Sequence, residues 1–261
     1  MSIREKIGTV VERLESRFGR EFGTCLNCGN PTRSHEVGAR KACHDCYSSG
    51  QGIPMTDGGE ERDVPIIETF PENVPEKFQS AGRWVCWANL EVSEGKYNKV
   101  PVAPWADGSA YPSKDYKQKI TGFDTASKYA AFDAYSSVLL SNLGVPDDMV
   151  PKLGLFYHIA EEGDGRRVLF IDLDDVRDPD TGALHPAAIE IIDAADSYAQ
   201  VSTSGTGVHV FVRGRLPDEY QTIQTTLEDT DEFPDAEIEV YDNDRLVAMT
   251  GDHIEGTPET V

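Results

Sequence analysis

Alternating apolar and polar positions predict a strand at residues 168–176, VLFIDLDDV, which ends in clustered aspartates. On such a strand Asp172 and Asp174 share one face, and aliphatic side chains share the other. Two neighbouring carboxylates at the end of a buried strand repel each other unless a divalent cation lies between them, and Mg²⁺ or Mn²⁺ takes oxygen ligands of this kind. The pattern indicates a metal site, although Asp and Glu make up 46 of the 261 residues and Asp-x-Asp also recurs by chance.

A second segment, residues 200–215, predicts a hairpin because Gly205 and Gly207 lie in a Ser/Thr-rich turn between two apolar runs. On its outgoing strand three valines share the core face, which leaves His209 and Arg213 on the opposite face. An imidazole, a guanidinium and the backbone N–H groups of a glycine-rich turn together suit a triphosphate. The alternative is an ordinary hairpin with a histidine on its surface.

A third segment, residues 236–253, predicts two more strands joined by an Asp-Asn-Asp turn. The first of these strands directs Ile238 and Val240 toward the core and Glu239 away from it. The segment therefore adds one more carboxylate on the polar face of a strand.

Helical periodicity predicts helices at residues 121–141, with Asp124 as a candidate N-cap, and at residues 185–199, with Pro186 at the first helical position. Strand, helix, hairpin and strand in this order favour an α/β (α+β) core in which helices cover one face of a split sheet. Near the N-terminus an apolar stripe predicts an amphipathic helix that packs on the rest of the protein or associates with a second copy.

Four of the five cysteines form two Cys-x-x-Cys pairs, Cys25 with Cys28 and Cys43 with Cys46. Pairs at this separation are typical of a closed structural Zn²⁺ site with four thiolate ligands. A redox pair or a disulfide framework is the alternative, and both fit poorly because the chain carries no signal peptide. The remaining cysteine, Cys86, lies in an apolar strand and is expected to be a small core residue.

The three segments, in this order, resemble the three-motif signature of the archaeo-eukaryotic primase superfamily, in the form found in phage and plasmid primase-polymerases. The stretches that carry the resemblance are FIDLDDV, STSGTGVHVFVRG and IEVYDNDRLVAMTG. An upstream block at residues 83–104, RWVCWANLEVSEGKYNKVPVAP, is similar to the Trp-x-x-Trp strand, lysines and Val-Pro with which that family opens. The resemblance covers roughly residues 70–257.

The resemblance implies that Asp172, Asp174 and Glu239 hold the catalytic Mg²⁺ or Mn²⁺ and that His209 contacts the phosphates of the incoming nucleotide. Asp175 competes for a place in the first motif, but strand alternation puts it on the apolar face unless the strand ends at Asp174. Further nucleotide contacts are expected from Ser204, Gly205, Arg213, Arg245 and Lys99.

The implied fold is a primase-polymerase core with a split, RRM-like mixed sheet. The expected organisation is an N-terminal helix at 1–22, a zinc ribbon at 23–50, an acidic and Gly-rich linker at 51–66 and the catalytic domain at 67–261. The implied activity is template-directed nucleotidyl transfer by two metal ions, with single-stranded DNA and dNTPs or NTPs as substrates and a separate helicase as partner. A catalytically silent, zinc-containing DNA-binding or replication-initiation module is the alternative, and a nuclease with the same metal-binding acids is a third.

The net charge of −22 opposes this interpretation, because DNA-binding proteins are usually basic. One explanation is adaptation to a salt-rich cytoplasm, as in haloarchaeal proteins and their mobile elements, since the Debye length falls to about 3 Å at 1 M salt. The other is that the chain does not bind nucleic acid. Clustering of the few basic residues favours the first, and the candidate contacts are Lys96, Lys99, Lys114, Lys117, Lys119, Arg213 and Arg215. With no transmembrane run or targeting peptide in the sequence, a cytoplasmic location is expected.

Overall fold

The computed structural model describes residues 23–24, 31–32, 69–93, 96–106, 116–131, 153–161, 167–217, 220, 222–227 and 230–261. The N-terminal helix, the four paired cysteines and the linker expected from the sequence lie outside these residues. In the described part of the ribbon region, Gly23–Thr24 (β1) pairs antiparallel with Pro31–Thr32 (β2), and β2 lies next to β9.

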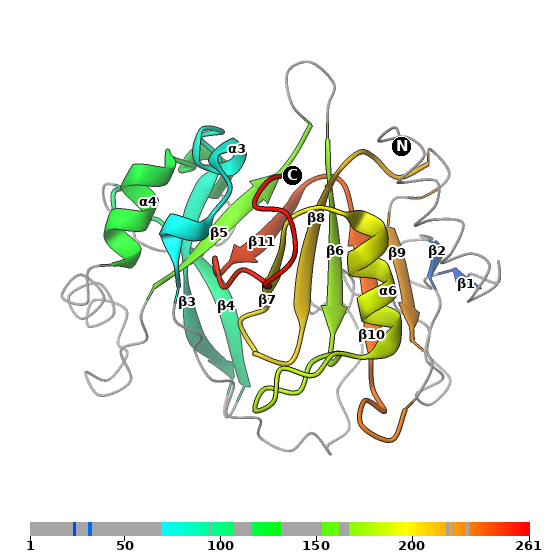
Figure 1. Cartoon of the computed structure of the whole chain (residues 1–261). Coiled ribbons are helices and arrows are strands. Elements are labelled where there is room, and N and C mark those ends of the chain that lie inside the picture. Colours follow the sequence, from blue (N-terminus) through cyan, green and yellow to red (C-terminus); the bar gives the residue numbers. More distant parts are fainter. Residues whose placement is uncertain are drawn as a thin grey trace.

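Five strands form an antiparallel sheet in the order β7-β8-β6-β10-β9 (Figure 1). The strands are β6 (Val168–Asp174), β7 (Ala199–Val201), β8 (Val208–Arg213), β9 (Thr222–Thr226) and β10 (Glu237–Tyr241). The pairing of β7 with β8 confirms the predicted hairpin, and the bounds of β6 and β10 confirm the two predicted strands. Their aliphatic side chains share one face, as the alternation in the sequence requires.

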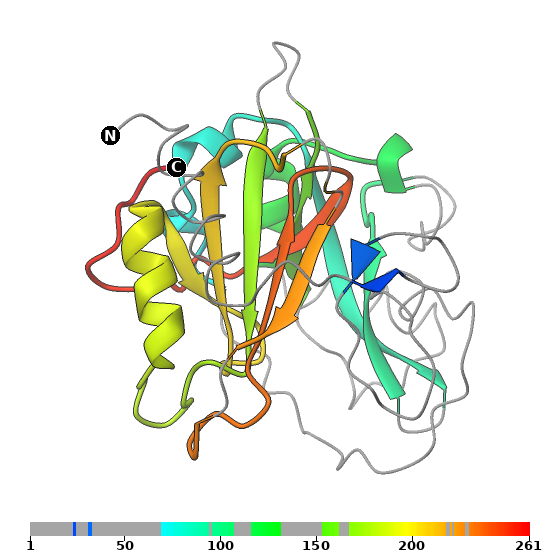
Figure 2. The same cartoon turned by 90° about the vertical axis from the view of Figure 1, so that its right-hand side faces the viewer.

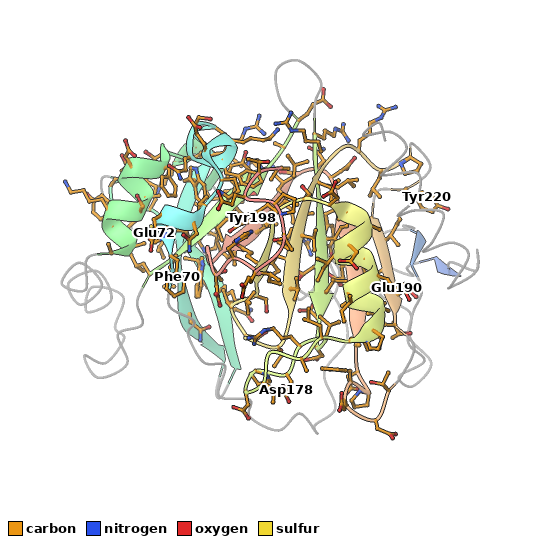
Figure 3. All side chains as sticks on the ribbon, viewed as in Figure 1. Phe70, Glu72, Asp178, Glu190, Tyr198 and Tyr220 are labelled. Atoms are coloured by element: carbon orange, nitrogen blue, oxygen red, sulfur yellow. The ribbon has the colours of Figure 1, made fainter. Side chains whose placement is uncertain are left out.

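Helix α6 (Pro186–Ala195) covers that aliphatic face (Figure 2). Pro186 is the first helical residue, as predicted, and the His185 ring caps the helix by accepting a 3.0 Å hydrogen bond from the backbone N–H of Ala187. The helix ends at Asp196, whose backbone adopts a left-handed conformation with φ of 43°, so it is shorter than the predicted 185–199. Side chains fill the space between helix and sheet, whereas Glu190 lies on the outer side (Figure 3).

A second antiparallel sheet has the order β11-β5-β3-β4. Its strands are β3 (Trp84–Ser93), β4 (Lys96–Val102), β5 (Gly154–Ile159) and β11 (Arg245–Met249). The sequence predicts a split, mixed sheet, and the described strands form two sheets in which all neighbouring strands are antiparallel. The fold is therefore mixed α+β with few helices.

An aromatic core lies between the two sheets. Phe170 on β6 and Phe211 on β8 are 5.3 Å apart between ring centroids, and Phe78 lies 5.1 Å from Phe211 and 4.8 Å from Tyr157 of β5. Cys86 is fully buried in this core, as predicted, and burial raises the pKa of its thiol to about 12. The face of the five-stranded sheet opposite α6 is thus apolar near the start of β6 and carries the acids near its end.

Short helices complete the described part of the fold: η1 (Pro71–Asn73), α3 (Glu76–Gln79), η2 (Tyr116–Gln118) and α4 (Phe123–Ala130). Helix α4 confirms the first part of the predicted helix 121–141, whose later residues lie outside the described chain. Its N-cap is Gly122 and not Asp124, which lies in the first turn, where a carboxylate is favoured by the positive end of the helix dipole. None of the helices among the described residues has the length and apolar character that a membrane span requires.

The chain passes from one sheet to the other within three residues, Asp242–Asp244, which link β10 to β11. Asp244 has a left-handed backbone with φ of 52°. Its carboxylate forms an ion pair with Lys117 and lies 3.1 Å from Nε2 of His158 on β5. This link is therefore fixed from both the second sheet and η2.

Candidate active site

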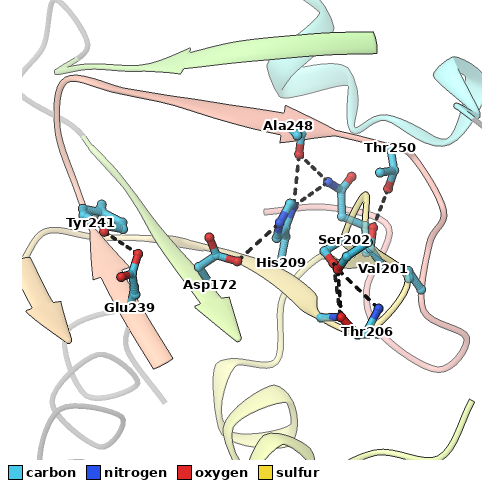
Figure 4. A network of polar contacts seen from close by, with 12 residues as sticks. Asp172, Val201, Ser202, Thr206, His209, Glu239, Tyr241, Ala248 and Thr250 are labelled. Atoms are coloured by element: carbon cyan, nitrogen blue, oxygen red, sulfur yellow. Dashed lines mark hydrogen bonds and ion pairs between the residues drawn. The ribbon is translucent and has the colours of Figure 1, made fainter. Parts of the chain in front are cut away.

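A continuous row of polar side chains crosses the five-stranded sheet. Its members are directly opposite one another in the strand register, in the order Gln200, His209, Asp172, Glu239 and Gln224. Directly opposed residues on antiparallel strands have their Cβ atoms about 4.5–5.5 Å apart on the same face. The register therefore places a histidine and a glutamate on either side of the central aspartate (Figure 4).

Asp174 lies two residues beyond Asp172 on the same face and directly opposite Glu237. It is the last residue of β6, because Asp175 adopts a left-handed backbone conformation with φ of 51°. Strand alternation therefore does not apply to Asp175. Because the strand ends at Asp174, Asp175 remains an alternative to Asp172 and Asp174 as an acid of the first motif.

Burial and neighbouring carboxylates raise the pKa values of Asp172 and Asp174. Burial raises the pKa of Asp172 well above its usual value, and the charges of Asp174 and Glu239 add to the effect. Solvent reaches the Asp174 side chain, but the protein atoms crowded around its carboxyl, together with Glu239 and Asp175, raise its pKa to about 6. Oδ1 of Asp172 is buried and accepts no hydrogen bond. The site thus concentrates negative charge that the described protein groups do not fully compensate.

His209 and the buried Gln200 amide share one hydrogen-bond acceptor, the Ala248 carbonyl. The Gln200 side-chain oxygen accepts hydrogen bonds from the Tyr198 hydroxyl (3.3 Å) and the Gly251 N–H (3.1 Å), so its Nε2 must be the donor to the Ala248 carbonyl (2.9 Å). Nδ1 of His209 lies 3.0 Å from the same carbonyl and 3.2 Å from Gln200 Nε2. Because the carbonyl can only accept, the shorter contact requires Nδ1 to carry the proton and donate to Ala248, and the contact between Nδ1 and the Gln200 nitrogen, itself a donor, is then not a hydrogen bond.

The imidazole consequently directs Nε2 at the acids. Nε2 lies 3.4 Å from Oδ1 of Asp172. Burial lowers the pKa of His209 to about 3, the positive charge of Lys99 contributes, and the Ala248 carbonyl opposes the shift. A neutral ring with a protonated Nδ1 leaves Nε2 as a hydrogen-bond acceptor. This nitrogen and the unpartnered oxygen of Asp172 face each other across a gap that suits a proton or a cation.

The turn at residues 202–207 lies against the end of β6. The Thr206 carbonyl accepts from the backbone N–H groups of Val176 (2.9 Å) and Arg177 (2.8 Å), and the Arg177 guanidinium donates to the Gly205 carbonyl (2.8 Å). Gly205 has φ of 78°, a conformation that suits glycine. The turn and the residues that follow β6 are therefore joined by three hydrogen bonds.

Hydroxyl groups brace this turn from inside. Ser202 and Ser204 are 2.8 Å apart between their Oγ atoms, and Ser204 lies 3.0 Å from Oγ1 of Thr206. Ser202 also accepts from the N–H of Gly207 at 3.1 Å. Oγ1 of Thr203 is buried without a hydrogen-bond partner in the described structure. Ser204 and Gly205 thus belong to a braced turn that is hydrogen-bonded to Val176 and Arg177, the residues that follow the aspartates.

Two basic residues from the second sheet act on the acids. Lys99 of β4 is attracted by the charges of Asp172 and Asp174, although protein atoms around its amine lower its pKa overall. Its Nζ lies 5.8 Å from the centroid of the buried Trp87 ring. Arg245 at the start of β11 adds positive charge near Asp172. The second sheet therefore supplies the cations that face the carboxylates of the first.

The chemistry of these donors fits a divalent cation. Three carboxylates on neighbouring strands provide oxygen ligands, and the buried Oδ1 of Asp172 is an oxygen that a cation would satisfy. In the part of the chain that the structure describes, no three carboxylate, imidazole or thiol groups are already drawn into a ready-made coordination sphere. Cation binding would therefore require side-chain adjustments among Asp172, Asp174 and Glu239.

The structure brings together most of the site residues expected from the sequence. Those that converge on one region are Asp172, Asp174, Glu239, His209, Ser204, Gly205, Lys99 and Arg245. Arg213 does not join them, because it lies four residues beyond His209 on β8, about 13 Å away at 3.3 Å per residue, and its Nε donates to the Val261 carbonyl. The zinc ligands Cys25, Cys28, Cys43 and Cys46 lie outside the described residues.

Sequence reasoning missed two residues that hold the site. Gln200 binds the Ala248 carbonyl that also accepts from His209, and its position opposite His209 follows only once the register of the hairpin is known. Tyr241 lies two residues after Glu239 on the same face of β10, and its hydroxyl donates to Glu239. The two-residue spacing between Glu239 and Tyr241 is the signal that could have identified it.

Comparison with known proteins gives one informative similarity. The chain is 35% identical over 88 residues to a protein named DNA Primase-polymerase from Nitratiruptor phage NrS-1. The match covers 34% of this chain and 11% of the phage protein, so the chain spans only a small part of that relative's length. No family model matches the chain. Part of the chain is therefore related in sequence to a phage DNA primase-polymerase.

Proposed function

We propose that the protein is a DNA primase-polymerase, a nucleotidyltransferase that forms phosphodiester bonds on a single-stranded DNA template with dNTPs or NTPs. The observation that carries this proposal is the polar row, in which Asp172 has Glu239 on one side and His209 on the other. The similarity to the phage primase-polymerase supports it, because a partial relative carries that name.

Each group has a defined task in this proposal. Asp172, Asp174 and Glu239 hold Mg²⁺ or Mn²⁺, which when bound would lower the pKa of the attacking 3′-hydroxyl and stabilise charge on the triphosphate. The fixed imidazole of His209 contacts the phosphates through Nε2, the atom that faces the acids. The turn with Ser204 and Gly205, which is hydrogen-bonded to the residues that follow Asp174, offers hydroxyl groups and backbone N–H groups to the phosphates.

Lys99 and Arg245 compensate the charge of the bound nucleotide from the opposite sheet. Their position suits electrostatic stabilisation of a transition state whose charge lies on phosphate oxygens. We extend the proposal to a structural Zn²⁺ held by the four paired cysteines, which would stabilise a module too small to fold without metal.

The acidic composition supports a salt-rich cytoplasm as the working environment, and a haloarchaeal mobile element as the source of such a protein. At molar salt the repulsion between an acidic surface and DNA is screened within a few ångströms. A separate replicative helicase would supply single-stranded template. These aspects rest on the sequence and on the proposed activity.

Strand synthesis on single-stranded DNA at molar KCl tests the proposal. Labelled dNTPs or NTPs are supplied with Mg²⁺ or Mn²⁺, with and without a primer, to the wild type and to Asp172→Asn and Asp174→Asn. Asp193→Asn on the exposed face of α6 is the matched control, since it removes the same charge away from the site. Synthesis that is lost in the two site variants and kept in the control supports the polymerase.

Product formed without a primer would in addition establish priming. A folded wild type that synthesises nothing under any of these conditions but shifts single-stranded DNA in a gel would favour the silent DNA-binding module. Degradation of the template that depends on Asp172 would favour a nuclease.

A further inference from the structure

Glu239 is the first member of a chain of three side chains that ends on the second sheet. The Tyr241 hydroxyl forms a short hydrogen bond with Oε2 of Glu239 (Figure 4). Nη2 of Arg245 donates to the same hydroxyl at 2.9 Å. The guanidinium also lies over the tyrosine ring, 4.1 Å from its centroid.

The direction of these hydrogen bonds is determined by chemistry. A guanidinium has only donors, so the Tyr241 oxygen must accept from Arg245. Its single proton is then left for the carboxylate, and the hydroxyl donates to Glu239. A donor polarised by a cation is a stronger donor, so Arg245 strengthens the bond that fixes the rotation of the Glu239 carboxylate.

Tyr241 can hold the Glu239 carboxylate in one orientation because its own ring is fixed by packing. Tyr241 is only 5% exposed and belongs to the aromatic core between the sheets. Its ring stacks on Phe170, with centroids 6.5 Å apart and an interplanar angle of 21°. Phe170 lies two residues before Asp172 on the same face of β6, so one packed layer supports both carboxylates.

We infer that Tyr241 is a positioning residue for the metal-binding carboxylate of Glu239, and that Arg245 acts on the same carboxylate through it. This inference rests on the proposed function, since it assumes that Glu239 binds a cation. Groups that hydrogen-bond to metal ligands typically change metal affinity or activity by 10- to 100-fold when they are removed.

Tyr241→Phe tests the inference with little disturbance, because it removes the hydroxyl and leaves the ring in the core. Mn²⁺ binding is measured by the electron paramagnetic resonance signal of free Mn²⁺, with and without a dNTP and without template, at molar KCl. Tyr220→Phe is the matched control, since Tyr220 packs on the α6 side of the five-stranded sheet. Thermal melting of each variant establishes that it is folded.

The expected result is Mn²⁺ affinity about 10-fold weaker in Tyr241→Phe, unchanged affinity in Tyr220→Phe, and strand synthesis that is restored by excess Mn²⁺. Arg245→Lys keeps the charge but loses the planar stack, so an intermediate loss of Mn²⁺ affinity is expected. If Arg245 acted only on the nucleotide, Arg245→Lys would instead change the KM for dNTP and leave Mn²⁺ affinity intact.

Two results would overturn the inference. A wild type that binds Mn²⁺ and synthesises DNA, beside a Tyr241→Phe variant with the same Mn²⁺ affinity, refutes the role of the tyrosine and leaves the proposed function standing. A folded wild type that binds no Mn²⁺ refutes the metal centre itself, and the role of Tyr241 with it.

Discussion

Replacing Gly207 by alanine should disturb both stability and activity, because this glycine lies where β8 meets the end of the strand that carries the aspartates. A Cβ at position 207 would lie 2.7 Å from the Leu173 carbonyl oxygen and 2.9 Å from Oγ of Ser202. Contacts below 3.0 Å are not tolerated, and one of the two obstacles is backbone. The adjacent residues, Leu173 and Val208, are paired in the ladder, so relief requires β8 to move away from β6.

The magnitude follows from the cost of overpacking. Inserting a methyl group into a closely packed site costs about 1–3 kcal/mol, which corresponds to a fall in Tm of roughly 2–12 °C for a protein of this size. The same displacement moves His209 relative to Asp172, and misplacement of reacting groups by about 1 Å can lower a rate by around 100-fold. We therefore expect strand synthesis to fall more than the loss of folded protein explains.

Urea unfolding and strand synthesis at a temperature where the variant is fully folded provide the two measurements. The control is Gly122→Ser, which adds a side chain where no atom lies within 4 Å, at the N-cap of α4, where serine is favoured. Its stability should be unchanged or higher. A Gly207→Ala protein with wild-type Tm and wild-type synthesis would refute the argument that β6 and β8 are in contact at this point.

Three further outcomes are expected. Burial raises the pKa of the Cys86 thiol to about 12, so this thiol should stay protonated at pH 8.5 and resist iodoacetamide in the native protein but react in urea. Peptide mapping by mass spectrometry measures the modification, and modification of the native protein would contradict the burial of Cys86. Gln200→Leu leaves the buried Tyr198 hydroxyl and the Gly251 N–H without their acceptor and should lower the free energy of unfolding by about 1–3 kcal/mol. An unchanged midpoint in urea titrations would argue against these hydrogen bonds to Gln200. Elemental analysis of the purified protein should find one Zn²⁺ per chain in the wild type and none in Cys25→Ser. A metal-free wild type would refute the prediction of a zinc ribbon.

The strands that carry the acids could be predicted because their two-residue alternation is strong. β6 and β10 each place aliphatic residues on the α6 side and acids on the other, as the sequence indicates. The hairpin could also be predicted, since its glycines and hydroxyl residues specify a turn. These are local properties, and they determine which face each side chain occupies.

The contacts between strands could not be predicted from the sequence in the same way. Whether Asp172 faces Glu239 or the neighbouring residue depends on the register between strands more than 60 positions apart. Alternation puts Phe211 on the same face as His209 and Tyr241 on the same face as Glu239, but the sequence does not reveal that a second sheet buries both rings. Arg213 was assigned to the site because it shares a face with His209, yet a shared face does not imply proximity along an extended strand.

The three-residue link between β10 and β11 limits how the two sheets can move. An extended chain of three residues reaches about 10 Å, so the sheets cannot separate by translation at this point. His158 and Lys117 hold Asp244 within the link, which restricts it further. The other end of β11 is tied to the first sheet as well, because the Gln200 amide donates to the Ala248 carbonyl, so any widening of the space between the acids and Lys99 must come from movement of β3 and β4 and leave β11 in place.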